Sequence, residues 1–120
     1  MRAKLRRLHS PDIHDLETYA PDEPDGFGFL LQILIGPEDG PGEESFDLEV
    51  CTPKWLMRTY GPSAIIPGMH RLIVFEYNYE RLYGFIDKQV GGVSGETWRD
   101  VARQLALLGH WEFDNYVAGP

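Results

Sequence analysis

The stretch from residue 27 to residue 35 constrains the fold more than any other part of the chain. Large apolar side chains occupy every second position in it: Phe27, Phe29, Leu31, Ile33 and Ile35. Alternate side chains of an extended strand lie on the same face, so this pattern predicts a strand with one fully apolar face. Leu30 and Leu34 fall on its other face, and we therefore expect a central strand that is covered on both sides.

A second strand is predicted directly after a turn. Residues 36–44 read Gly-Pro-Glu-Asp-Gly-Pro-Gly-Glu-Glu, and glycine and proline at this density are typical of a turn. Over residues 45–52 the chain alternates again, with Phe46, Leu48 and Val50 expected to face inward and Asp47 and Glu49 outward. Two alternating strands on either side of a short turn predict an antiparallel hairpin.

Shorter elements flank the predicted hairpin. Residues 3–8 are expected to form an edge strand, because their lysine and arginine side chains oppose pairing with another molecule. Residues 10–26 are predicted to form a long acidic loop, since prolines interrupt them. Thr52 is a predicted N-cap for a short helix over residues 53–60, which Gly61 ends.

The C-terminal half is predicted to contain one more strand and two helices. The strand is expected over residues 71–77, and a helix over residues 79–90 follows it with Asn78 as its predicted N-cap. A last helix begins at Ser94 or Thr97 and is capped by Gly109, and the aromatic residues 111–116 are expected to fold back onto the sheet. This order predicts an α+β fold: a small, mainly antiparallel sheet of about four strands with the C-terminal helices packed on one face.

Length and composition are typical of a soluble protein with one domain, residues 1–120. The single cysteine, Cys51, excludes an intramolecular disulfide and fits a reducing compartment. No apolar run approaches the roughly 20 residues that a membrane helix needs, and none follows the basic N-terminus as it does in a signal peptide. We therefore expect a cytoplasmic protein.

Charge is distributed unevenly along the chain. The net charge is −8, from 19 acidic and 11 basic side chains. Residues 11–50 contain twelve acidic side chains and no lysine or arginine, whereas residues 51–120 contain seven of each sign. Nucleic-acid-binding domains and proteins that bind anionic membranes normally present a basic face. Direct binding to nucleic acid or to a membrane is therefore not expected.

Nine acidic side chains are the candidate partner-binding residues: Asp22, Glu23, Asp25, Glu38, Asp39, Glu43, Glu44, Asp47 and Glu49. A solubilising surface normally mixes both signs of charge, and here one sign is missing over forty residues. Because strand alternation directs two of the nine outward beside two acidic loops, we expect one anionic surface that attracts a basic partner. A purely solubilising face is the alternative interpretation.

Standard catalytic and metal-binding patterns are absent from the sequence. The four histidines show no ligand spacing, and no second cysteine accompanies Cys51. The chain also lacks a Gly-X-Ser-X-Gly elbow, a dinucleotide fingerprint and a phosphate loop. We therefore expect no metal, no cofactor and no enzymatic activity. One catalytic alternative stays open: Glu76 shares a predicted strand face with Leu72 and Val74, which would partly bury its carboxyl group beside His70.

Several short segments, taken in order along the chain, resemble one family. They are His9-Ser10-Pro11-Asp12, Phe27 through Gly36-Pro37, Phe46, Cys51 through Leu56, Thr97-Trp98 and Trp111-Glu112-Phe113. With this ordered set the chain resembles, from Leu5 to Tyr116, the immunity protein eight family of bacterial polymorphic-toxin and contact-dependent growth inhibition systems.

The resemblance implies a non-catalytic cytoplasmic α+β protein that binds and neutralises the C-terminal domain of a cognate toxin. Many such toxin domains are nucleases, whose substrate-binding surfaces are basic, and an acidic surface would suit such a partner. A soluble interaction or scaffold module without inhibitory activity is the alternative. The sequence leaves the identity of the toxin and the oligomeric state open.

Overall fold

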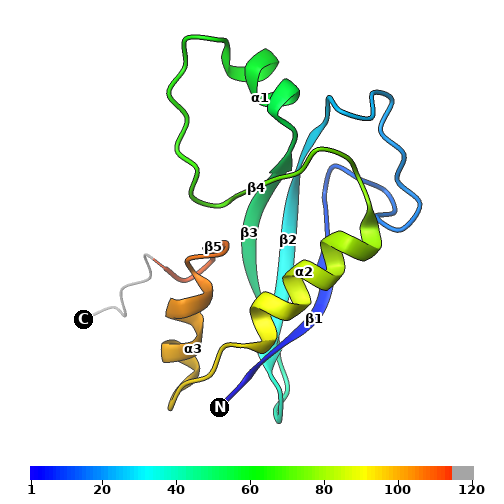
Figure 1. Cartoon of the computed structure of the whole chain (residues 1–120). Coiled ribbons are helices and arrows are strands. Elements are labelled where there is room, and N and C mark those ends of the chain that lie inside the picture. The colour runs from blue at the N-terminus through cyan, green and yellow to red at the C-terminus, as the bar shows by residue number, and fades with distance from the viewer. Residues whose placement is uncertain (115–120) are drawn as a thin grey trace.

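The β2–β3 hairpin forms the middle of the sheet. In the computed structural model, which describes residues 1–114, β2 (Gly28–Pro37) pairs antiparallel with β3 (Glu44–Cys51) along nearly its whole length. β1 (Ala3–His9) pairs antiparallel with the other side of β2. The hairpin and the N-terminal strand are therefore confirmed, and β2 is central (Figure 1).

Two short strands extend the sheet beyond β3. β4 (Arg71–Ile73) runs parallel to β3 beside residues 49–51, and β5 (His110–Trp111) runs antiparallel beside residues 46–47. The sheet of residues 1–114 thus has five strands and is mostly antiparallel. The predicted strand over residues 71–77 is shorter than expected, because β3 ends at Cys51 and leaves no partner beyond the hydrogen bond from Val74 N to Cys51 O.

Each of the three helices among residues 1–114 begins at a predicted cap. Thr52, Asn78 and Thr97 cap α1 (Pro53–Tyr60), α2 (Tyr79–Gly91) and α3 (Trp98–Leu105) through their side-chain oxygens. The last helix ends at Leu105, four residues before Gly109. The chain continues from there in a tighter turn, in which Leu108 N donates a hydrogen bond to Leu105 O.

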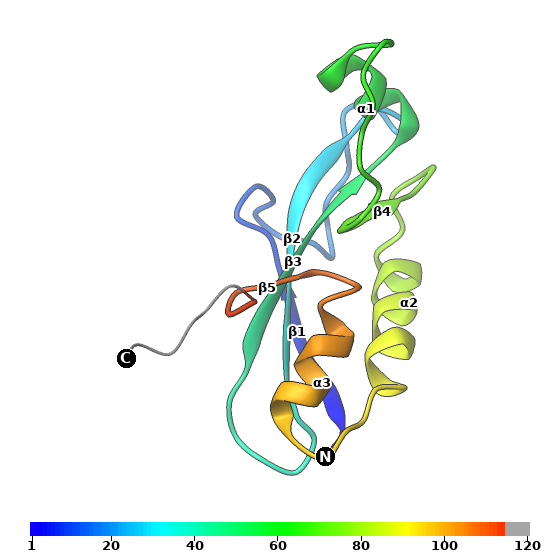
Figure 2. The same ribbon diagram turned by 90° about the vertical axis from the view of Figure 1, so that its left-hand side faces the viewer.

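The core lies between the sheet and the helices α2 and α3, which cover the same face (Figure 2). The five alternating apolar side chains of residues 27–35 are all buried in it, and so are Ile86 and Val90 of α2 and Val101 and Leu105 of α3. The expectation that the central strand is covered on both sides is wrong, since Leu30 on the opposite face is 37% exposed. The α+β fold with helices on one face is confirmed.

The acidic loop over residues 10–26 is held against the core by its own side chains. Tyr19 packs edge-on against Phe27, Phe29 and Tyr77, with ring centroids 4.9–6.3 Å apart. The hydroxyl group of Tyr77 donates a hydrogen bond to the backbone carbonyl of Leu16. This loop is therefore attached to the scaffold at several points along its length.

Thr52 joins the end of the hairpin to α1. It is fully buried, and its hydroxyl oxygen accepts hydrogen bonds from the backbone N–H groups of Phe27, at 3.3 Å, and of Trp55, at 3.2 Å. The Trp55 ring lies against Gly28, where a β-carbon would come within 2.3 Å of it. The hydroxyl group of Thr52 thus fixes the position of α1 relative to β2 and β3.

We expect Thr52→Val to lower the free energy of unfolding by about 1–3 kcal/mol, because the buried N–H group of Phe27 and the partly buried N–H group of Trp55 lose their acceptor. Thr52→Ser keeps the hydroxyl group and should cost much less. Urea denaturation followed by tryptophan fluorescence measures both variants. A larger loss in Thr52→Ser than in Thr52→Val would contradict this role, because valine keeps the methyl group of Thr52 and serine keeps its hydroxyl group.

Candidate partner-binding site

The nine predicted partner-binding residues occupy three places in the fold. One group lies in the loop before β2, a second in the turn between β2 and β3, and a third on β3; they are Asp22, Glu23 and Asp25, then Glu38, Asp39 and Glu43, then Glu44, Asp47 and Glu49. Because the loop and the turn lie at opposite ends of the hairpin, the nine residues do not form one compact patch (Figure 1).

Several of these carboxylates pair with cations of the same chain. Glu43 lies 2.8 Å from a guanidinium nitrogen of Arg7, and Glu49 lies 2.9 Å from that of Arg71, its neighbour across the β3–β4 register. Glu38 makes a longer contact of 3.8 Å with Arg2. All of these cations come from outside residues 11–50. The local negative charge is therefore smaller than the count along the sequence indicates.

Glu23 is the most strongly paired carboxylate of the set. It accepts hydrogen bonds from Arg58 and Lys54, both on α1, and Lys54 also lies 3.5 Å from Asp25. The hydrogen bonds from Arg58 and then Lys54 lower the pKa of Glu23 to about 2. Since this cluster is open to solvent, its net contribution to stability is modest.

Glu44 has a structural role that the sequence did not reveal. Its Oε1 atom accepts hydrogen bonds from the indole N–H groups of Trp98, at 2.7 Å, and Trp111, at 2.9 Å. Trp111 stacks on Phe46, with ring centroids 6.3 Å apart. Glu44 thus links β3 to α3 and β5 through these two partly buried hydrogen bonds.

The C-terminal residues fold back onto the sheet, as predicted, as far as the structure describes them. Trp111 pairs with Phe46 in β3, and the carboxylate of Glu112 accepts a hydrogen bond from Ser45 N at 2.8 Å. Residues 115–116, which belong to the same prediction, lie outside the described residues.

Two of the nine acidic residues remain exposed and form no ion pair among residues 1–114: Asp22 and Asp39. Asp22 belongs to the loop before β2, and Asp39 to the turn at the other end of the hairpin. Asp47, on the sheet face opposite the helices, accepts a hydrogen bond from Ser45. Of the nine carboxylates, Asp22 and Asp39 are therefore exposed and not neutralised by a cation of the described residues.

Glu76 is not the buried carboxylate that a catalytic role would need. The chain leaves the sheet at Ile73, so Glu76 does not share a covered strand face, and its side chain is 69% exposed and lies 3.7 Å from Arg81. His70 instead bonds the backbone carbonyl of Ala106 at 2.6 Å. Glu76 does border a cavity of about 500 Å³, but His70 is not among its lining residues.

The thiol of Cys51 is unsuited to nucleophilic attack. Cys51 is fully buried at the end of β3, and burial raises the pKa of its thiol to about 11. The protonated thiol dominates at neutral pH, whereas a nucleophilic cysteine needs the thiolate. Cys51 therefore acts as a small core residue.

Residues 1–114 contain neither a metal-binding cluster nor a membrane-spanning helix. No group of three or more histidine, cysteine, aspartate or glutamate side chains is placed to hold a metal ion there. In the same residues, no helix combines the length and the apolar character needed to cross a membrane.

Comparison with known proteins identifies the family. The family model described as immunity protein 8 matches residues 3–116, nearly the whole chain. The chain belongs to the immunity protein 8 family. A search of curated proteins gave no match, and neither did a search of solved structures.

In this immunity protein 8 chain, the residues that carry the family resemblance mainly hold the fold together. Thr52 and Trp55 hold α1 at the end of the hairpin, and Trp98 and Trp111 share the carboxylate of Glu44. The carboxylate of Asp12 accepts a hydrogen bond from Leu30 N at 2.9 Å. The segments that carry the resemblance therefore help to specify the fold.

Two adjacent carboxylates should respond very differently to substitution. We expect Glu44→Ala to lower the free energy of unfolding by about 1–3 kcal/mol, because two indole N–H groups lose a charged acceptor. Glu43→Ala should change stability little, since its pair with Arg7 is open to solvent. Thermal denaturation of both variants tests this difference, and similar melting temperatures would contradict the role of Glu44.

The Glu23 cluster should make the stability of the fold depend on pH in the acid range. A carboxylate with a lowered pKa stabilises the fold fully above its ordinary pKa of 4.5, and this contribution is lost as the pH falls toward about 2. Glu23→Gln should therefore be less stable than the parent protein at neutral pH, and the difference should disappear between pH 4.5 and 2. Melting temperatures across this range measure it; a difference that persists to pH 2 would contradict the pairing.

Proposed function

We propose that this chain is an immunity protein that binds and neutralises the C-terminal toxin domain of a cognate polymorphic or contact-dependent inhibition toxin. Membership of the immunity protein 8 family, over residues 3–116, is the observation that carries this proposal. The protein acts in the cytoplasm, where it meets the toxin domain, and it acts by occupying a surface of the toxin and not by catalysis.

The toxin domain is a nuclease with a basic substrate-binding surface. The net charge of −8 supports this choice, because an anionic protein accelerates association with a basic partner. Such attraction acts over about 8 Å at physiological salt. It therefore depends most on carboxylates that are exposed and not neutralised within the chain, which favours Asp22 and Asp39 over Glu23, Glu43 and Glu49.

The exposed acidic residues lie at two separate places on the surface, and each place can attract the partner. The loop that contains Asp22 lies at one end of the hairpin, and the turn that contains Asp39 lies at the other. One toxin domain that covers the sheet face between them would contact both, together with Asp47. A toxin domain that docks at one end would depend on one of the two carboxylates alone.

Co-expression with the protein encoded immediately upstream tests the immunity role. The two proteins should co-purify, and the cells should survive only when both are made. The association rate should fall on the order of 10-fold as salt screens the charges. Failure of the pair to bind, or cell death despite full expression, would overturn the immunity function.

Two charge reversals then locate the acidic contact. Asp22→Lys and Asp39→Lys should each slow association if the toxin covers both ends of the hairpin, and only one should do so if it covers one end. Asp87→Lys is the matched control, since Asp87 is an exposed carboxylate on α2 that makes no ion pair within residues 1–114. If all three variants slow association equally, net charge and not an acidic surface determines the rate.

A further inference from the structure

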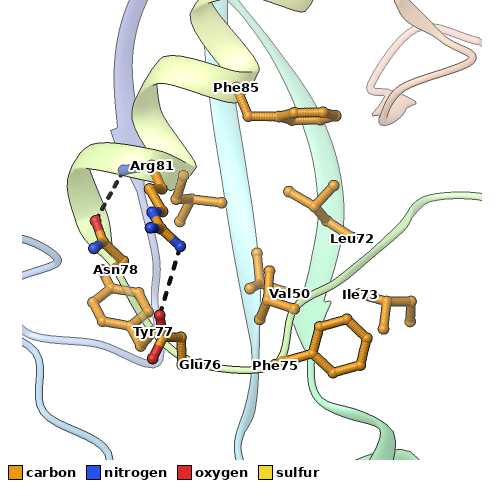
Figure 3. A pocket seen from close by; sticks show the side chains of 11 residues that line it. Val50, Leu72, Ile73, Phe75, Glu76, Tyr77, Asn78, Arg81 and Phe85 are labelled. Carbon is orange, nitrogen blue, oxygen red and sulfur yellow. Dashed lines mark hydrogen bonds and ion pairs between the residues drawn. The ribbon is translucent and has the colours of Figure 1, made fainter.

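An apolar groove lies between α2 and the segment that begins with β4. The cavity of about 500 Å³ described above belongs to this groove. Phe85 extends from α2, and Leu72 and Phe75 extend from β4 and the segment after it (Figure 3). Phe75 is 76% exposed, and Phe85 and Ile73 are also exposed. Three large apolar side chains that face solvent around one concavity are unusual on a protein that works alone.

The polar side chains of the groove are already engaged within the protein. Arg81 and Glu76 pair with each other at 3.7 Å, and the Asn78 side chain accepts the hydrogen bond from Arg81 N that caps α2. The hydroxyl group of Tyr77 donates to Leu16 O. A site for a small polar ligand needs several converging polar groups that are free to bind it, and this groove offers apolar surface instead.

We propose that this groove anchors the toxin domain by receiving an uncharged, apolar side chain of that domain. The inference rests on the proposed immunity function and names the surface through which it operates. An aromatic or aliphatic side chain in the groove would displace water from Phe75, Phe85 and Leu72. Such buried anchors supply most of the binding free energy in protein interfaces.

Charge favours the toxin domain over a second copy of this chain as the occupant. Two copies would each bring a net charge of −8 to the interface and repel each other, whereas a basic toxin domain is attracted. The groove itself is electrically balanced, because its arginine and glutamate are paired. It is therefore complementary to an uncharged side chain that lies within a basic surface.

The groove and the acidic loops should act on different rate constants. Loss of an apolar anchor mainly speeds dissociation, whereas loss of exposed charge mainly slows association and weakens its dependence on salt. We expect Phe75→Ala and Phe85→Ala each to raise the dissociation rate of the toxin complex by about tenfold or more. Their association rates and salt dependence should stay close to those of the parent protein.

Leu107→Ala is the matched control for Phe75→Ala. Leu107 is 75% exposed, almost the same as Phe75, lies in the turn after α3 and does not line the groove. The experiment uses the full chain and the purified toxin domain in surface plasmon resonance. Thermal denaturation confirms that each variant is folded, as expected for substitutions of exposed side chains.

The outcomes separate this inference from the immunity function. If the parent protein binds the toxin and both phenylalanine variants dissociate as slowly as Leu107→Ala, the groove is not the anchor, and the immunity function stands. If sedimentation of the protein alone shows dimers that Phe75→Ala dissociates, the occupant is a second copy and the inference is overturned. If the parent protein does not bind the toxin, the immunity function fails, and the inference fails with it.

Discussion

The single apolar face of the β2–β3 hairpin determines most of the architecture. Five alternating side chains on residues 27–35 are removed from water only if other elements cover that face. The helices α2 and α3 do so from one side and leave the other face of the sheet open (Figure 2). The exposed acidic side chains of residues 11–50 consequently lie in the turn and in the loop before β2, and Asp47 and Glu49 lie on the open face. The location of the acidic residues thus follows from which face is buried.

Local signals predicted the elements, and contacts distant in sequence set their limits. Alternation predicted the hairpin, and the side chains of Thr52 and Asn78 predicted two helix starts. For the third helix, Thr97 was one of two candidate caps, the other being Ser94. The length of β4 depended on the point at which β3 ends, and β5 has only two residues, which is too few for a periodic pattern. The exposed face of β2 was not predicted, because Leu30 and Leu34 are apolar and their residue type does not show which face the helices cover.

The candidate site was predicted less well than the fold, for an electrostatic reason. A count of charges along residues 11–50 shows the acidic side chains but not the cations that fold against them from Arg7, Lys54, Arg58 and Arg71. The count of charges also cannot show that Glu44 accepts hydrogen bonds from two indole N–H groups. Pairing of this kind connects residues dozens of positions apart, so only the fold separates structural carboxylates from those available to a partner.

Electrostatic attraction of a partner and apolar anchoring of that partner require different kinds of surface. In this protein the two surfaces belong to different elements. Exposed carboxylates attract any basic protein and therefore discriminate poorly among toxins. An apolar groove whose charges are already paired discriminates better, because a charged side chain placed there gains no apolar contact and has to compete with the pair of Glu76 and Arg81. Specificity for one toxin would then reside between α2 and β4, while the acidic loop and turn set how quickly the two proteins meet. An immunity protein gains from both, since it has to bind its toxin quickly and retain it.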